Sequence, residues 1–260
     1  MIKSVFWWQT FSHGNTLCEV VRNLKRLNVD RVEIKAADGT VAFTNPAWSA
    51  WRGKPNLTVD LVAMLHEQNI QVFGWGYNYG KYPELEGDIA AQQCVTLNLD
   101  GWIFDVETQL IDLPDAEKRV HRMMKNFRSL AHKRYAGFSS FPCWHNPNPP
   151  WPVWWKRGVW DAFAQYVDFW EPQAYWGEKW GTNAVQLPID AILQHREIKD
   201  LPVIPAGRGW SDGAGKCTPG FIDEFVKSSR DNGAAGVSWW VSELILKDPI
   251  ITEAIAQILP

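Results

Sequence analysis

Residues 101–107 read GWIFDVE, and residues 71–77 read QVFGWGY. Both are short runs rich in apolar, β-branched and aromatic residues, which is typical of buried β-strands. Six more such runs occur along the chain, and a segment with helical periodicity follows most of the eight. The predicted strands are Ser4–Thr10, Arg31–Ala37, Gln71–Tyr77, Gly101–Glu107, Ala136–Phe141, Val167–Tyr175, Pro202–Gly207 and Ala235–Val241.

The spacing of these runs decides the fold class. Successive runs begin about 27 to 40 residues apart, which is the length of a strand–helix unit with its loops. Strands that alternate with helices form a parallel sheet, and eight units predict a single (β/α)8 TIM barrel over residues 1–260. An open doubly wound sheet is the alternative, but it does not need eight evenly spaced strands. No G-x-G-x-x-G motif follows the first run either.

Start signals of helices lie between the predicted strands. Thr16 and Glu19 form a capping-box pair, which predicts that a helix begins directly after Thr16. Residues 113–115, LPD, predict another start, because proline is tolerated in the first turn and an acidic side chain favours the positive end of the helix dipole. Thr218-Pro219 and Asp248-Pro249 predict the last two helices in the same way.

The composition excludes several classes of function. The net charge is -3, so we expect no surface for nucleic acid or for anionic lipid. No apolar run reaches the roughly 18 residues of a membrane helix, and the N-terminus shows no signal-peptide pattern. The four cysteines lie far apart and no H-E-x-x-H motif occurs. We therefore expect a monomer without a disulfide framework, a metal or an organic cofactor.

The 17 tryptophans are an unusual number for this length. Flat aromatic faces on that scale favour a sugar ligand, and a large aromatic core is the alternative. Residues 142–155, PCWHNPNPPWPVWW, form a proline-stiffened loop after the fifth predicted strand, at the mouth of the barrel where active sites are built. We expect Trp144 and Trp151 of this loop to line a sugar-binding groove. A hydrophobic plug over the mouth is the alternative.

Two acidic residues end the fourth predicted strand. Side chains alternate along a strand, so Asp105 and Glu107 point the same way, and with Ile103 in the core both emerge at the mouth. Two acids held that close cannot easily both be charged, so one pKa must rise. Cleavage of a glycosidic bond needs such a pair, because the leaving oxygen is protonated while positive charge develops on the sugar. A solvated pair at a strand end is the alternative.

Other inward-facing side chains complete the predicted site. Glu33 and Lys35 share a face, which predicts a buried ion pair, although Lys35 can instead hold Asp105 or Glu107 ionised. On the sixth predicted strand, Gln173 and Tyr175 place an amide and a phenol near the acids. The alternative is that Tyr175 only fills the interior of the barrel. The predicted substrate-binding residues are Tyr175, Gln173, Trp240, Lys35, Asp38, Trp75, Tyr77, Trp144 and Trp151.

These residues carry a resemblance to two families of glycoside hydrolases. The segment Lys35–Thr40, followed by Phe43 and Ala47, resembles the second-strand motif of family 25 lysozymes. Residues 104–107, FDVE, resemble their fourth-strand D-x-E, and residues 170–175 resemble their W-x-x-Q-Y segment. Residues 100–107 also resemble the chitinase-like family 18 signature D-G-x-D-x-D-x-E, and the Gln173–Tyr175 and Gly236–Trp240 segments resemble the sixth and eighth strands of that family.

The chain also departs from both patterns. A family 25 lysozyme has an aspartate on its first strand, where residues 5–9, VFWWQ, offer only Gln9. A family 18 enzyme has a third acid at the position of Ile103. Both resemblances nevertheless imply glycans with N-acetylated sugars as substrate, whose own acetamido group assists the cleavage.

We therefore predict a glycoside hydrolase that cleaves N-acetylated polysaccharide, with peptidoglycan ahead of chitin, as in a lysozyme or endolysin. Glu107 is the predicted general acid/base, and Asp105 orients the acetamido group or stabilises positive charge. An enzyme that degrades cell walls without a leader fits a phage lysin or a chain whose leader has been removed. Three alternatives stay open: a family 18-like chitinase or N-acetylglucosaminidase, a carbohydrate-binding barrel that has lost catalysis, and a hydrolase of neutral glucans.

Overall fold

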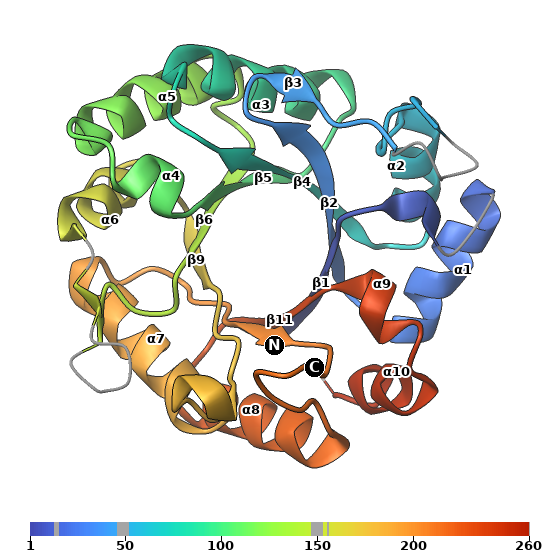
Figure 1. Cartoon of the computed structure of the whole chain (residues 1–260). Helices are drawn as coiled ribbons and strands as arrows, with labels where there is room; N and C mark the ends of the chain where they lie inside the picture. Colours follow the sequence, from blue (N-terminus) through green and yellow to red (C-terminus); the bar gives the residue numbers. More distant parts are fainter. Residues whose placement is uncertain (13–15, 46–51, 147–152, 155, 260) are drawn as a thin grey trace.

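The computed structural model describes residues 1–12, 16–45, 52–146, 153–154 and 156–259. Its centre is a ring of parallel strands with helices packed around the outside (Figure 1). The ring consists of β1 (Ile2–Trp7), β2 (Arg31–Asp38), β4 (Gln71–Asn78), β5 (Gly101–Val106), β6 (Tyr135–Ser140), β9 (Phe169–Pro172), β10 (Ala206–Arg208) and β11 (Gly236–Trp240). Short antiparallel pairings add β3 (Val41–Ala42) at the end of β2 and join β7 (His145–Asn146) to β8 (Val153–Trp154).

The strand pairing closes the ring. The hydrogen-bonded order is β10-β11-β1-β2-β4-β5-β6-β9, and bridges from Trp170 to Val203 and from Gln173 to Ala206 join β9 to the segment that contains β10. The predicted single barrel of eight parallel strands is therefore confirmed. In such a barrel the carboxyl ends of all strands meet at one mouth, so side chains at those ends lie close together.

Helices follow most of the strands and form the outer layer (Figure 1). They are α1 (Leu17–Leu27), α2 (Val59–His66), α3 (Pro83–Thr96), α4 (Thr108–Ile111), α5 (Ala116–Leu130), α6 (Arg157–Ala164), α7 (Gln186–Ile198), α8 (Pro219–Asp231), α9 (Ser242–Ile245) and α10 (Pro249–Ala256), with 3-10 turns η1 (Thr10–Ser12) and η2 (Glu178–Trp180). In the described part of the chain, no helix combines the length and the apolar composition needed to cross a bilayer.

The predicted start signals hold for three of these helices. Thr16 and Glu19 make both hydrogen bonds of the capping box at α1, and Thr218 and Asp248 cap α8 and α10. The helix predicted from residues 113–115 is present, but it begins just after them. Asp115 itself is the N-cap and α5 begins at Ala116, because the short helix α4 and its turn occupy the chain up to that point.

Two strands are shorter than the sequence predicts. The run Val167–Tyr175 contains the strand Phe169–Pro172, and the run Pro202–Gly207 pairs regularly only from Ala206 onward. Proline lacks the N–H that a strand ladder needs, which explains why regular pairing ends at Pro172 and begins after Pro205.

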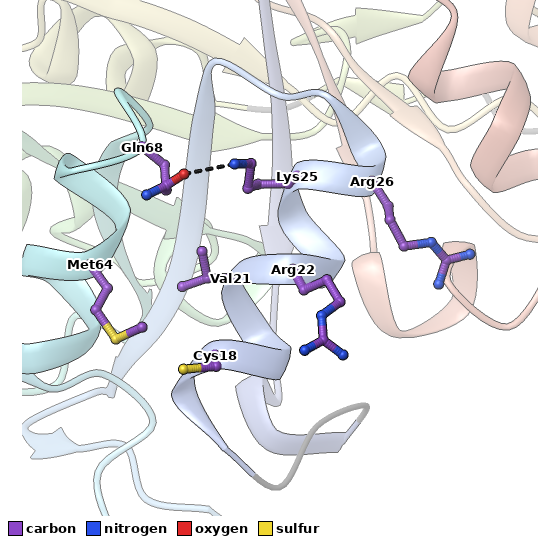
Figure 2. A pocket seen from close by; sticks show the side chains of 7 residues that line it. All are labelled: Cys18, Val21, Arg22, Lys25, Arg26, Met64 and Gln68. Atoms are coloured by element: carbon purple, nitrogen blue, oxygen red, sulfur yellow. Dashed lines mark hydrogen bonds between the residues drawn. The ribbon is translucent and has the colours of Figure 1, made fainter.

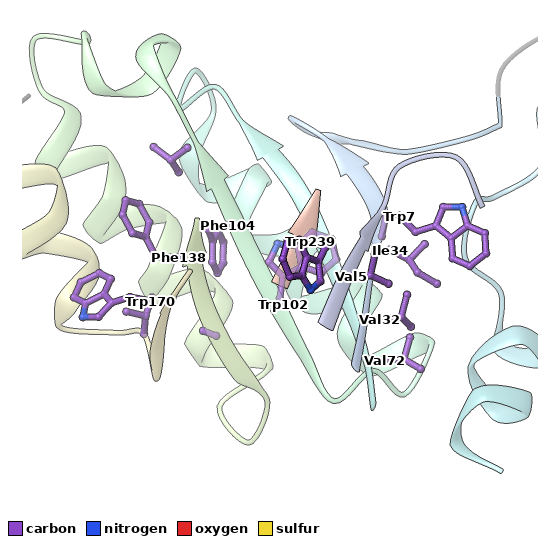
Figure 3. Close-up of a cluster of buried hydrophobic side chains, with 14 of the residues drawn as sticks. Val5, Trp7, Val32, Ile34, Val72, Trp102, Phe104, Phe138, Trp170 and Trp239 are labelled. Carbon is purple, nitrogen blue, oxygen red and sulfur yellow. The ribbon is translucent and has the colours of Figure 1, made fainter. Parts of the chain in front are cut away.

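Alternation along the strands divides the buried side chains into two cores. The outer core lies between the strands and the helices and is rich in aromatic rings, among them Trp102, Phe104 and Trp239 (Figure 3). The inner core fills the barrel and contains Phe6, Phe73, Trp75, Ile103, Phe169, Ile204, Ala206 and Val241. Trp7, Trp102, Trp160, Trp170, Trp176 and Trp239 are all buried in the outer core. An aromatic core thus explains much of the tryptophan content, and other indoles remain at the mouth.

The close contact between α3 and α5 depends on a glycine. A methyl group at Gly87 would overlap the carbonyl oxygen of Met123, which is backbone and cannot rotate away. We expect Gly87→Ala to lower the free energy of unfolding by about 1–3 kcal/mol, the usual cost of overpacking. Gly220→Ala is the matched control on α8, because its nearest neighbour would be Thr218 Oγ1 at 3.9 Å. Urea unfolding of both variants tests this, and equal stability of the two would contradict it.

Candidate active site

The two predicted acids lie at the carboxyl end of β5. Asp105 is on the strand, between Tyr77 of β4 and Ser139 of β6 in the sheet register. Its side chain is almost completely buried, whereas Glu107 follows the strand as the half-buried N-cap of α4. Glu107 is thus nearer to the solvent at the mouth, with Asp105 below it.

Two further predicted residues contact these acids. Gln173 Nε2 donates a hydrogen bond to Asp105 Oδ1 at 2.9 Å. Tyr77 Oη lies 3.4 Å from Glu107 Oε2 and also donates to Gln109 Oε1. The barrel therefore brings together an acid pair, an amide and a phenol from three strands that are distant in sequence, as the alternation pattern predicts.

The electrostatics of the pair differ between its members. Burial and, after it, the negative charge of Glu107 raise the pKa of Asp105 to about 8. The Lys35 ammonium and the hydrogen bond from Gln173 act in the opposite direction. The sequence predicts that one pKa must rise, and in the structure the rise falls on Asp105 because it lies deeper. Asp105 therefore holds a proton at neutral pH.

Aromatic rings surround the acids on the other strands. Trp240 at the end of β11 lies 5.5 Å from Phe6, 5.5 Å from Trp75 and 6.4 Å from Tyr175, measured between ring centroids. Burial, followed by the charges of Asp105 and Glu107, raises the pKa of the Tyr175 phenol. This phenol remains a hydrogen-bond donor at every pH that enzymes use. The predicted residues Trp75, Tyr175 and Trp240 thus form one contiguous aromatic group inside the mouth.

The predicted ion pair between Glu33 and Lys35 is wrong. Lys35 Nζ instead pairs with Asp38 Oδ2 at 2.9 Å, and Tyr79 Oη donates to the other carboxylate oxygen of Asp38 at 2.8 Å. The ammonium lies 4.9 Å from the ring centroid of Trp75 and 4.9 Å from that of Phe43. A β-bulge between Lys35 and Ala37 shifts the register at this end of β2, so that Asp38 approaches Lys35 more closely than alternation alone would predict.

Glu33 belongs to a different cluster, deeper in the barrel. Arg31 Nε donates to Glu33 Oε1 at 2.8 Å, and Arg31 Nη2 lies 3.4 Å from Glu171 Oε2. All three side chains are buried, and the guanidinium also lies over the rings of Phe73 and Phe169. Two carboxylates share one cation, so burial and the charge of Glu33 raise the pKa of Glu171 well above its usual range.

Sequence reasoning missed three residues at the mouth. Trp8 follows β1 directly and its indole lies 6.4 Å from that of Trp240. Arg208 ends β10, fully buried, with its guanidinium 4.4 Å from the ring centroid of Trp210. Trp210 in turn lies 5.4 Å from Tyr175. Alternation from Phe6 could have found Trp8, whereas Trp210 lies beyond the predicted strand and carries no such signal.

The tryptophan-rich loop lies largely outside the described residues, and Trp151 is among those not described. Trp144 is half-buried against the outer core, with the guanidinium of Arg157 5.2 Å from its ring centroid. Its role in a sugar-binding groove stays a prediction.

A separate hollow lies on the outer surface, between α1 and α2 (Figure 2). Its volume is about 510 Å³, and Lys25 Nζ donates to Gln68 Oε1 across it at 2.8 Å. It is lined by Cys18, Val21, Arg22, Lys25, Arg26, Met64 and Gln68. It contains none of the predicted site residues, so the mouth of the barrel is the candidate active site.

Solved structures with a similar fold include chitinases, spore cortex-lytic enzymes and a mannanase. A family 18 chitinase from Pseudoalteromonas aurantia superposes with a TM-score of 0.72 at 15% identity, over 99% of this chain and 99% of that one. The spore cortex-lytic enzyme SleL of Bacillus cereus matches with a TM-score of 0.69 at 8% identity, over 98% of this chain and 73% of the enzyme. An endo-1,4-β-D-mannanase from Thermotoga petrophila matches with 0.66 at 12% identity, over 92% and 88%.

These likenesses concern the fold. No protein-family model matches the chain, and neither does any curated protein. The chain has the TIM-barrel fold found in family 18 glycoside hydrolases, and its similarity to chitinases and to SleL agrees with the family 18 part of the sequence resemblance. The mannanase shows that the same fold also serves a polysaccharide other than chitin or cortex.

Proposed function

We propose that this protein is a glycoside hydrolase that cleaves polysaccharides of N-acetylated sugars at the mouth of its barrel. The observation that carries the proposal is the pair formed by Asp105 on β5 and Glu107 directly after this strand, with Gln173 hydrogen-bonded to Asp105 and Tyr77 to Glu107. Catalytic groups at the carboxyl ends of barrel strands are the rule in this fold. The fold shared with family 18 chitinases supports the same substrate class.

In the proposed reaction Glu107 is the general acid, since it is the more exposed carboxyl and follows the strand at the mouth. At rest the pair holds one proton, on Asp105, and this proton passes to Glu107. Glu107 gives it to the leaving glycosidic oxygen and then accepts a proton from the attacking water. Both carboxyls lie at the same end of β5, so we expect both on one side of the bound sugar, with neither able to attack from the opposite face. The oxygen of the substrate's own acetamido group is the nucleophile instead. It bonds to the anomeric carbon as the leaving group departs, and the attacking water then displaces it.

Asp105 and its neighbours position that acetamido group. Once its proton has passed to Glu107, the Asp105 carboxylate accepts a hydrogen bond from the acetamido N–H, and Gln173 fixes the orientation of this carboxylate through the 2.9 Å contact. The phenol of Tyr175 supplies a hydrogen-bond donor, and the indole of Trp240 forms an apolar floor for the sugar ring. These contacts add stabilisation where charge develops in the transition state.

We place chitin-type oligosaccharides first among substrates, ahead of the peptidoglycan that the sequence favours. The family 18 signature and the chitinase fold support this order. Peptidoglycan is the second candidate, because the fold is also that of a spore cortex-lytic enzyme. A binding barrel without catalysis remains the rival from another class, since Ile103 replaces one acid of the signature.

A panel of polysaccharides tests the proposal. Reducing-sugar release is measured on chitin oligomers, peptidoglycan, mannan and a neutral glucan, with wild-type protein and with Glu107→Gln. The proposal predicts release from the N-acetylated substrates by the wild type only. Release of reducing sugar from mannan or glucan alone would show that the substrate belongs to another class. Binding of chitin oligomers without any release would support the binding barrel.

The pH dependence of kcat/KM should report the raised pKa of Asp105. Asp105 acts in its protonated form, so kcat/KM should fall about tenfold per unit above pH 8, where this proton is lost. Asp105→Asn cannot ionise and has no proton to pass to Glu107. We expect this variant to be slower, with no alkaline limb in this range. An alkaline limb that persists unchanged in Asp105→Asn would assign it to another group.

A further inference from the structure

An exposed indole stands beside the candidate active site. Trp8 follows β1 directly and is 42% exposed, whereas the five strand residues before it, 3–7, are buried. Its ring centroid lies 6.4 Å from that of Trp240, and the two planes are inclined by only 33°. Lys35 Nζ lies 5.5 Å from the Trp8 ring centroid. The two indoles therefore extend the aromatic surface of the mouth outward from the acids.

A buried asparagine fixes the backbone that carries this indole. Asn56 is fully buried, and its Nδ2 donates to the carbonyl oxygens of Trp8 at 3.0 Å and of Lys35 at 2.9 Å. Its Oδ1 accepts from the backbone N–H of Thr10 at 2.8 Å. One amide thus ties the segment after β1 to the end of β2. A buried amide with three satisfied hydrogen bonds holds such a segment in one conformation.

The next residue is held from the opposite side. The backbone N–H of Gln9 donates to the carboxylate of Glu243, a buried residue of α9, and Trp7 Nε1 donates to the carbonyl oxygen of Gln9 at 3.1 Å. The exposed ring of Trp8 therefore projects from a backbone that is fixed on both sides. A rigid exposed indole loses little conformational freedom when a flat ligand packs on it, which is the property of a built binding surface.

We propose that Trp8 is a sugar-stacking platform that binds the pyranose ring next to the one on Trp240. The inference rests on the proposed function in one respect, namely that the ligand is an N-acetylated oligosaccharide. It adds a subsite on the β1 side of the mouth and makes the protein select for chains over short fragments. The apolar face of a sugar ring packs on an indole, and the fixed angle between Trp8 and Trp240 suits two consecutive rings of a twisted chain.

Calorimetric titration tests this in the Glu107→Gln background, where ligands are not consumed. Diacetylchitobiose and a pentamer of N-acetylglucosamine are the probes. We expect Trp8→Ala to weaken binding of the pentamer by roughly ten- to a hundredfold, the worth of one large buried apolar contact. Binding of the dimer should weaken less, and Trp8→Phe should restore most of the affinity for the pentamer. Tyr82→Ala is the matched control, because Tyr82 is an exposed aromatic residue at the N-cap of α3.

The inference would be overturned if the parent and Trp8→Ala bound the pentamer with equal affinity. It would also be overturned if the parent bound neither the dimer nor the pentamer. Failure of the proposed function has a different signature. In that case the wild type cleaves no N-acetylated glycan, whereas the loss of pentamer affinity in Trp8→Ala is still measured. Melting temperatures of all variants should agree with that of the parent, since the removed ring lies at the surface.

Discussion

Replacement of Glu107 by glutamine is expected to lower kcat on a chitin oligomer by roughly 10²- to 10⁴-fold, the usual contribution of a general acid. Glutamine has nearly the same shape and keeps an acceptor for Tyr77 Oη, so the geometry at the end of β5 should survive. The amide cannot give a proton to the leaving oxygen. The loss should therefore appear in kcat, with KM changed little.

Two comparisons make this result specific. Glu224→Gln, an exposed residue of α8, removes one carboxylate remote from the mouth and should retain full activity. The melting temperature of Glu107→Gln should equal or slightly exceed that of the wild type, because a negative charge that faces buried Asp105 disappears. Wild-type kcat in Glu107→Gln would exclude Glu107 as the acid.

The second large effect concerns stability. Arg31→Met should lower the free energy of unfolding by about 3–5 kcal/mol at neutral pH, because it leaves Glu33 and Glu171 buried without their shared cation. Removal of one partner from a buried charge cluster lowers the free energy of unfolding for this reason, even when the intact cluster itself adds little to that free energy. Arg22→Met, on the exposed face of α1, is the control and should change stability little.

The pH dependence separates this charge effect from a packing defect. The folded-state pKa of Glu171 is raised above its unfolded value, so the stability linked to this group is present at low pH and is lost as the pH rises through the folded pKa. The loss in Arg31→Met should therefore be larger at pH 8 than at pH 5. Adding Glu171→Gln to Arg31→Met should recover part of it. Denaturant unfolding at both pH values measures these differences. If Arg31→Met lost the same unfolding free energy at pH 5 and at pH 8, the cause would be a packing cavity instead.

The barrel and the core of the site could be predicted from the sequence because both depend on local patterns. Runs of strand-forming residues at regular intervals define the eight strands, and the period of two along a strand places Asp105 and Glu107 on one face. The same period identifies Gln173, Trp75 and Trp240 as inward residues. Closure of the barrel then brings them together without further information.

The remaining features depend on contacts between strands that no local pattern contains. Which acid pairs with Lys35 is decided by the β-bulge in β2 and by the presence of Arg31 one layer below Glu33. Which of the two acids carries the raised pKa is decided by depth in the barrel. Trp8 owes its fixed position to Asn56, which lies 48 residues along the chain. These properties follow from three-dimensional packing alone.

The proposed hydrolysis by this barrel depends on the substrate's acetamido group. It is tested most directly by comparing a pentamer of N-acetylglucosamine with the same pentamer after deacetylation, at equal concentration, with product release followed by mass spectrometry. We expect the wild type to cleave the acetylated pentamer and to leave the deacetylated one intact, and Glu107→Gln to cleave neither. Equal cleavage of both pentamers by the wild type, or cleavage of neither, would contradict it.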